Sequence, residues 1–326
     1  MYRETRLALL VAVAVGIAAA AGAAVAAEKY PTKPIRMVVP FPPGFASDFL
    51  ARTVGQRLGE SYSQQIVIDN RPGAGGLIGS GIVAKASPDG YTLMMVGQAH
   101  LINALIHKHP DYHPFNDFAA VTQIALMPSV MVIPPNLPVK SLADLIALAK
   151  AKPGQYNFAS GGVGTWSHFS GEMFKSAARI DIVHVPFRLL ADSLTEMAAG
   201  RVHLYVLPLP AAMPILKSGK LRALVVTTAR RVAAMPEVPT TVEAGLPDYR
   251  TDSWFGIGTP ARTPRAIIAQ LNKDIVRIVQ ETEIRERFLG QGAEPAFGTP
   301  EQFLKLQKDE YVQVQKLVKD LGIESR

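Results

Sequence analysis

The sequence contains no cysteine among its 326 residues. This absence excludes disulfide bonds, a lipid-modified cysteine, catalysis by a thiolate and zinc bound through sulfur. A chain of this length needs no disulfide, because it is long enough to bury a large core in one or two domains. Charged residues make up only 19% of the chain and hydrophobic residues 48%, which predicts a packed globular protein.

Several motifs of common enzymes and nucleic-acid-binding proteins are also missing. The glycine-rich segment 73–79, GAGGLIG, lacks the spacing of a dinucleotide-binding loop, and neither a P-loop nor a G-x-S-x-G nucleophile elbow is present. The formal net charge is +7, but no run of lysine and arginine alternates with aromatic residues, so we expect no nucleic-acid partner. The mild positive charge favours anionic ligands, or serves only solubility. We expect no cofactor, no metal and no catalytic residue.

The N-terminal segment has the features of a secretory signal peptide. A basic start precedes an apolar stretch over residues 7–22, and residues 24–26, AVA, have the small-residue pattern of a cleavage site. The alternative is an uncleaved membrane anchor, since residues 7–27 carry no charge and are long enough to span a bilayer. The second half of the segment is mostly alanine and glycine, which favours cleavage. We predict a signal peptide at residues 1–26 and a soluble periplasmic protein.

From residue 34 onward, short apolar runs alternate with segments of helical periodicity. Strand-like runs at 35–41, 65–72 and 91–97 are separated by 47–62 and 73–87, whose character is helical. This βαβαβ order is typical of a parallel sheet with helices on its faces. A similar series of strands and helices follows from residue 128. Two such α/β units on one exported chain suggest a clamshell that holds a ligand between two lobes.

Two loops lie where ligands usually bind in such sheets, beyond the carboxyl ends of strands. The first is residues 42–48, PPGFASD, and the second is residues 160–168, SGGVGTWSH. Each opens a helix, whose first N–H groups and positive dipole end attract anions. We predict that both loops bind a carboxylate. The alternative for each loop is an ordinary turn that leads into a capped helix.

Two enzyme-like readings stay open at this point. His168, with Ser167 or Ser170, could form the active site of a secreted hydrolase, although adjacent helical residues do not face each other. His107, His109 and His113 could hold a metal ion, but the same segment reads as a polar surface loop.

Six segments of the chain, in order, resemble one family. They are YPTKPIRMVVPFPPGFASDFLAR, IVIDNRPGAGGLIGSGIVAKASPDGYTLMM, ASGGVGTWSHFSGEMFK, PEVPTTVEAGLPDY, SWFGIGTPARTP and QGAEPAFGTPEQF. Together they resemble the Bug receptors, periplasmic solute-binding proteins of tripartite tricarboxylate transporters (the TctC type). The resemblance covers essentially the whole chain after the predicted signal peptide.

The resemblance implies an α/β fold of two domains, a type II-like Venus flytrap in which each domain is a mainly parallel sheet flanked by helices. By analogy, domain 1 takes residues 28–125 and 255–326, and domain 2 takes residues 126–254. The resemblance also implies a small carboxylate ligand held by the two loops, often with ordered water, and delivery to a membrane permease. A soluble ligand sensor is the alternative role. We expect a monomer.

Three positions depart from the family pattern. Phe45 stands where a second glycine is usual, Trp166 replaces a small polar residue, and the third loop reads VPFRL in place of VPYKG. Leu207 stands near the usual place of an acidic residue that can pair with a ligand amino group. These departures disfavour an amino-acid ligand and favour a carboxylate with an aromatic or apolar body, unless the side chains only pack between the domains. Arg188 either binds a distal carboxylate or is a solvated surface charge.

The complete set of predicted ligand-binding residues is Pro43, Gly44, Phe45, Ala46, Ser47, Asp48, Gln98, Ser160, Gly161, Gly162, Gly164, Thr165, Trp166, His168, Phe187 and Arg188.

Overall fold

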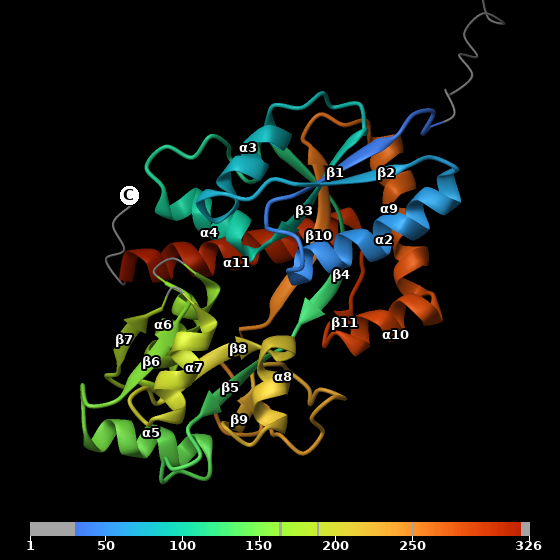
Figure 1. The fold of residues 1–326 in the computed structure, drawn as a ribbon. Helices are drawn as coiled ribbons and strands as arrows, with labels where there is room; N and C mark the ends of the chain where they lie inside the picture. Colours follow the sequence, from blue (N-terminus) through green and yellow to red (C-terminus); the bar gives the residue numbers. More distant parts are fainter. Residues whose placement is uncertain (1–29, 163–164, 188, 250, 321–326) are drawn as a thin grey trace, which may run out of the picture. The chain divides into compact units, whose positions relative to one another are not determined.

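The computed structural model describes residues 30–162, 165–187, 189–249 and 251–320, so the predicted signal peptide lies outside the described residues. From Lys33 onward the chain forms one compact unit, and its described strands form two separate sheets, shown in Figure 1. Helices flank both sheets. The predicted α/β class is therefore confirmed.

The first sheet has six strands, and most of its residues come from the first 130 positions. In spatial order they are β11 (Glu294–Pro295), β4 (Phe118–Met127), β10 (Ser253–Pro260), β3 (Thr92–Gly97), β1 (Ile35–Val39) and β2 (Ile66–Asn70). The helical elements around this sheet are α2 (Ala46–Tyr62), η1 (Ala74–Gly76), α3 (Leu77–Ala84), α4 (Gln98–Ile106), α9 (Arg265–Gln280), α10 (Thr282–Gly290) and α11 (Pro300–Asp320). The residues of β1 other than Arg36 are hydrophobic and fully buried, which fits a central strand covered on both faces.

The second sheet has five strands from the middle of the chain. In spatial order they are β7 (Val183–Pro186), β6 (Asn157–Ser160), β8 (Leu204–Pro208), β5 (Ser129–Ile133) and β9 (Arg222–Val226). The helices of this part are α5 (Leu142–Ala151), α6 (Trp166–Ala178), α7 (Leu190–Ala198) and α8 (Leu209–Lys217). A capping box between Ser141 and Asp144 starts α5.

Each sheet is mixed, whereas the sequence predicted mainly parallel sheets. Strand β10 runs antiparallel to both β3 and β4, and β5 runs antiparallel to both β8 and β9. The physical reason is that the chain passes between the sheets more than once. Strand β4 leads directly into β5 across Pro128, and the chain returns from β9 to β10. In each sheet, a strand next to a crossing, β10 or β5, runs antiparallel to its neighbours, whereas the strands of the βαβ units are parallel. The predicted domain boundaries near residues 125 and 255 stay predictions.

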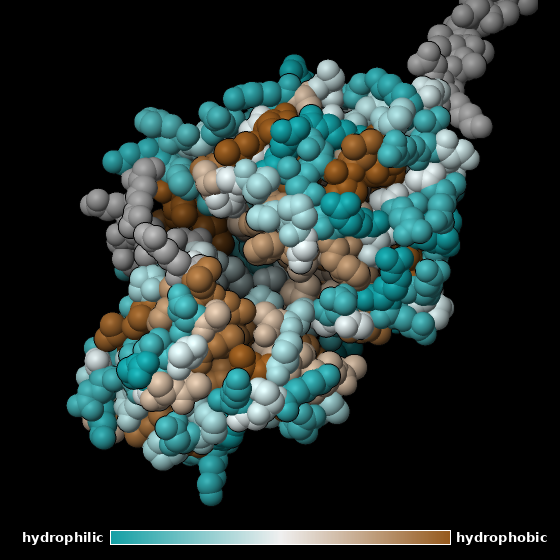
Figure 2. All heavy atoms as spheres, viewed as in Figure 1, coloured by the Kyte–Doolittle hydropathy of each residue, from teal (hydrophilic) through white to brown (hydrophobic). Residues whose placement is uncertain are grey.

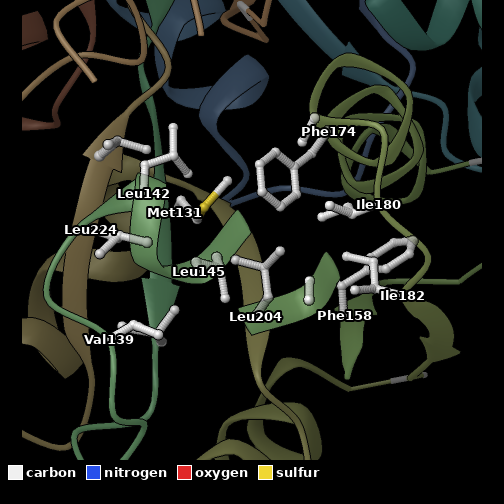
Figure 3. Close-up of a cluster of buried hydrophobic side chains, with 14 of the residues drawn as sticks. Met131, Val139, Leu142, Leu145, Phe158, Phe174, Ile180, Ile182, Leu204 and Leu224 are labelled. Carbon is white, nitrogen blue, oxygen red and sulfur yellow. The ribbon is translucent and has the colours of Figure 1, made fainter. Parts of the chain in front are cut away.

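A hydrophobic core under the second sheet holds α6 in place. Side chains from β5, β6, β8, α5 and α6 converge there, and Figure 3 shows Phe174 of α6 among Met131, Leu204 and Ile180. Each large side chain of this kind stabilises the fold by about 1.5–3 kcal/mol when fully buried. Figure 2 shows that hydrophobic residues also reach the surface, in patches between hydrophilic ones.

Gly171 permits the close contact between α6 and β6. A Cβ atom at this position would lie 2.1 Å from the ring of Phe158, which is too close for any van der Waals contact. We predict that Gly171→Ala destabilises the protein by about 1–3 kcal/mol, because overpacking a tight core forces side chains off their rotamers. Urea unfolding measures the change.

Gly290 provides a matched control in the last turn of α10. A Cβ atom at Gly290 meets nothing within 4 Å, so Gly290→Ala should change the unfolding free energy by less than about 1 kcal/mol. Equal stability of the two variants would contradict the close packing of α6 on β6.

Candidate functional site

The loop between β1 and α2 is a rigid turn organised by one carboxylate. Gly44 adopts a φ of +85°, a left-handed conformation that glycine takes without strain. The Asp48 carboxylate accepts the Gly44 N–H at 3.0 Å, the Arg52 Nε–H at 3.0 Å and the Asn70 Nδ2–H at 3.0 Å. These contacts join the turn, the helix and β2. The Pro-Pro-Gly sequence thus ends the strand and aims the start of α2.

The Asp48 carboxyl is nearly buried, yet it stays ionised. Burial alone would raise its pKa, but the hydrogen bonds from Arg52, the Gly44 N–H and Asn70 outweigh that effect and lower the pKa below its usual value. The sequence predicted Asp48 as a ligand-binding residue. The structure instead directs its carboxylate to the turn itself.

Helix α2 begins without a side-chain cap. Phe45 occupies the N-cap position, and no side-chain oxygen accepts an N–H group of the first turn. The N–H groups of Asp48 and Phe49 donate hydrogen bonds to the Phe45 carbonyl oxygen. Within the described part of the chain, no acceptor takes the N–H of Ala46 or Ser47, and no hydrogen bond engages the Ser47 hydroxyl. Two backbone donors and a hydroxyl are therefore available at this helix start.

In the loop before α6, more of the polar groups form hydrogen bonds within the loop itself. Thr165 caps α6, because its hydroxyl accepts the His168 N–H at 3.4 Å. The Gly161 N–H donates to Ser167 Oγ, and the Gly162 N–H donates to Ser160 Oγ, both at 3.0 Å. The hydroxyls predicted to face a ligand thus stabilise the turn. Gly164 and Arg188, also predicted in the site, lie outside the described residues.

A cavity of about 310 Å³ lies where the two helix starts face the crossing strands. Six predicted residues line it: Phe45, Ala46, Ser47, Gln98, Thr165 and Trp166. The described lining also contains Phe41, Gly75, Gly97, Ala99, Ile102, Asn103, Met127, Pro208, Ser253, Trp254 and Phe255. These others come mainly from the start of α4 and from the ends of β4, β8 and β10.

The other described residues of the predicted set lie outside the lining: Pro43, Gly44, Asp48, Ser160, Gly161, Gly162, His168 and Phe187. Phe187 packs against the core of the second sheet, as does the buried Leu207. Sequence analysis predicted Gln98 but missed the rest of α4 and the crossing strands as parts of the site. The signal that could have found them is the apolar strand 91–97 followed at once by polar residues, the same pattern that marked the first loop.

His168 lies beside the site in a stacked pair with His184, with ring centroids 4.1 Å apart. Burial, helped by the nearby His184 and Lys175, lowers the pKa of His168 to about 4, so the ring is neutral at pH 7. Ser170 bonds Tyr249 and Thr251 through its hydroxyl. Its hydroxyl is thus committed to these two partners, which weakens the hydrolase hypothesis.

The histidine-rich loop has a structural role at His113. The His113 Nδ1 atom accepts the N–H groups of Phe115 and Asn116, at 3.2 and 3.1 Å, and so closes the turn. Over the residues that the structure describes, no three side chains are grouped to hold a metal ion, and no helix is long and apolar enough to cross a membrane.

Residues 50–323 match the family described as the tripartite tricarboxylate transporter family receptor, TctC. The chain belongs to this family. It is 34% identical to the protein BugT of Bordetella pertussis over 302 residues, which are 92% of this chain and 93% of BugT. The chain is therefore a solute-binding receptor of the TctC or Bug type.

Solved structures of similar proteins share the fold. The R. palustris protein Rpa4515, solved with adipate, is 37% identical, with a TM-score of 0.77 over 90% of this chain and 98% of its own. MatC of Rhodopseudomonas palustris, solved with bound malate, is 30% identical, with a TM-score of 0.72 over 89% of this chain and 100% of its own. The predicted two-lobe fold of periplasmic binding proteins is confirmed by this likeness.

The turn before α2 leads to a test of Asp48. Asp48→Asn should destabilise the receptor by about 1.5–3 kcal/mol at pH 7, because the charged acceptor of three hydrogen bonds is lost. The pKa of Asp48 is lowered by folding, so this stabilisation is present above the unfolded pKa and disappears as the pH falls through the folded pKa. Urea unfolding at pH 7 and at pH 3 measures both effects.

Glu60→Gln on the same helix is the charge-matched control for Asp48→Asn. Glu60 forms an ion pair with Arg57, and its side chain is 49% exposed, so its loss should change the free energy of unfolding by less than about 1 kcal/mol. A cost of Asp48→Asn that stayed the same at pH 3 would show that the carboxylate charge does not organise the turn.

Proposed function

We propose that this receptor binds a small carboxylate with an apolar or aromatic body and delivers it to the membrane permease of a tripartite transporter. One observation carries this proposal: the N–H groups of Ala46 and Ser47 have no described acceptor and stand at the wall of a cavity otherwise lined mainly by apolar and aromatic side chains. Such a cavity offers donors at one end and apolar contact along the rest.

The start of α2 is the proposed carboxylate site. A negative group near a helix N-terminus gains about 0.3–1 kcal/mol, and up to ~2 kcal/mol where the site is partly buried. Ser47 is almost fully buried, and its hydroxyl can add a hydrogen bond. Thr165 and Trp166, at the start of α6, line the same cavity from the second part of the fold. Ordered water can complete the contacts that the two loops do not make directly.

The aromatic lining favours an apolar body on the ligand. Phe41, Phe45, Trp166, Trp254 and Phe255 all contribute to the wall. The Trp166 indole N–H donates to the Thr251 carbonyl oxygen at 3.2 Å, so this side chain offers the ligand its ring and not its donor. The adipate and malate in the two related structures support a small carboxylate as the ligand class.

An amino group on the ligand would have no carboxylate partner in the lining. Among the described residues that line the cavity, none is an aspartate or a glutamate. Leu207 points into the core of the second sheet. An ammonium group would lose its hydration without a counter-charge, which disfavours an amino-acid ligand.

The proposed role needs no chemical step and needs the protein outside the cytoplasm. Relatives of this chain are periplasmic receptors, so we propose export through the predicted signal peptide and residence in the periplasm. Closure of the two lobes on the ligand would create the surface that the permease recognises. We propose that the receptor acts without catalysis.

A thermal-shift screen of organic acids tests the proposed ligand class. We expect benzoate-type acids to raise the melting temperature by about 5–10 °C at one hundred times the dissociation constant, since such an excess adds about 2.7 kcal/mol of stability. Benzyl alcohol is the control, because it keeps the ring and lacks the carboxylate. If no acid in a broad panel shifts the melting curve, or if the alcohol shifts it equally, the proposal is wrong.

Trp166→Ser tests the contact with the ligand body. We expect calorimetry to show about tenfold weaker binding of benzoate, which corresponds to a loss of 1.4 kcal/mol of aromatic contact, and less than threefold weaker binding of succinate. Phe297→Ser, at an aromatic side chain that is 43% exposed and outside the cavity lining, is the matched control and should leave both affinities unchanged. If Trp166→Ser binds benzoate with unchanged affinity, the indole of Trp166 does not contact the ligand.

A further inference from the structure

We infer that the cavity selects monocarboxylates, and that Glu310 of α11 is the residue that disfavours a second carboxylate on the ligand. This inference rests on the proposed function and narrows its ligand class. It follows from the charges and donors of the lining and from one buried acid directly behind it.

The described lining of the cavity carries no charged side chain at all. None of the described lining residues is a lysine, arginine or histidine, so a carboxylate away from the helix start finds no cation among them. Moving an ionised carboxylate out of water without a partner is costly. One anionic end can bind at Ala46 and Ser47, where backbone donors are available. The start of α4 also lines the cavity and also lacks a side-chain cap, but there Gln98 bonds the buried acid Glu310, whose charge would repel a second carboxylate.

The side-chain N–H groups of the lining are already engaged. Gln98 and Asn103 each donate to a backbone carbonyl oxygen at 2.6 Å, and the Trp166 indole does so at 3.2 Å. The Trp254 indole donates to the carboxylate of Glu310. These four side chains therefore have few donors left for a distal carboxylate.

Glu310 lies behind two of these lining residues. It accepts hydrogen bonds from Trp254 and Gln98, and its helix α11 packs against α4 and β4. Within the described chain no salt bridge includes Glu310. Burial raises the pKa of Glu310 to about 7, although the two hydrogen bonds oppose that rise. At neutral pH this side chain is therefore partly ionised, and its negative charge lies directly behind the residues that line the cavity.

The helices and strands packed against α11 contain few titratable groups, and the loop whose Phe115 contacts Tyr311 of α11 contains His113 and Asp117. On α4 the ionisable group is His100, whose pKa burial lowers to about 4. Strands β4 and β10 contain no ionisable residue. The charged residues of α9 are Arg265, Lys273, Asp274 and Arg277. Since Glu310→Gln leaves all of these in place, that variant isolates the contribution of Glu310.

Three ligands of equal chain length separate charge from shape. Hexanoate, 6-aminohexanoate and adipate share one carboxylate and differ only at the far end, which is neutral, positive or negative. We expect isothermal titration calorimetry at pH 8 to show that hexanoate binds at least tenfold more tightly than adipate, with 6-aminohexanoate between them. An affinity for adipate equal to or above that for hexanoate would overturn the inference and leave the proposed carboxylate receptor intact.

Glu310→Gln keeps the size of the side chain and its acceptor for Trp254. In this variant we expect adipate to gain at least threefold relative to 6-aminohexanoate, with hexanoate affinity changed less than twofold. Equal losses for all three ligands would assign Glu310 a structural role only and would overturn its part in selectivity.

The pH profile of the unaltered receptor tests the same point without a variant. The preference for 6-aminohexanoate over adipate should rise by at least threefold from pH 6 to pH 8, because Glu310 loses its proton over this range. The ratio should stay constant in Glu310→Gln. A constant ratio in the unaltered receptor would also overturn the role of Glu310. If none of the three acids, nor benzoate, binds at any pH, the proposed function itself fails together with this inference.

Discussion

The site depends on the way helix α2 begins. A helix leaves its first N–H groups without intrahelical acceptors, and a side chain at the N-cap can satisfy one of them. Here the order Phe45-Ala46-Ser47-Asp48 puts an aromatic residue at that position and the polar residues inside the helix. The Asp48 carboxylate turns back to the Gly44 N–H and to Arg52, so it leaves the N–H groups of Ala46 and Ser47 unpaired. A rigid turn thus holds open donors at the cavity wall.

The segments that cross between the sheets tie this helix start to the rest of the cavity. Gln98 at the start of α4 donates to the Asp252 carbonyl oxygen, and Trp166 at the start of α6 donates to the neighbouring Thr251 carbonyl oxygen. Thr227 joins the same segment through the Asp252 carboxylate. Residues that line the cavity are therefore fixed by the strand that connects the two sheets. Any change in the angle between the sheets must move these contacts, which couples cavity shape to the crossing segments.

The sequence predicted those strands and helices whose formation depends on the residues within the element itself. The apolar runs and helical periods located β1, α2, β3 and α6, because burial on one face imposes the period. The same reasoning missed α8, which contains Pro210 in its first turn, where proline is tolerated, and Pro214 inside the helix, where proline is rare. Of the predicted site, the first loop contributes Phe45, Ala46 and Ser47 to the cavity wall. The role of Asp48 could not be assigned from the sequence alone, because Asn70, one of its three partners, comes from strand β2.

Long-range packing also explains why the position of Glu310 behind the cavity could not be predicted from the sequence. It belongs to an amphipathic helix of twenty-one residues with many charged side chains, where one more glutamate reads as a solvated residue. Only the packing of α11 on α4 and β4 brings it to Trp254, fifty-six positions earlier in the chain. A glutamate in that place keeps the indole oriented and sets the electrostatic potential behind an otherwise uncharged wall. The chemistry of the cavity is thus divided between backbone donors at one helix start and a buried acid on the last helix, and a change at either end alters which anions fit.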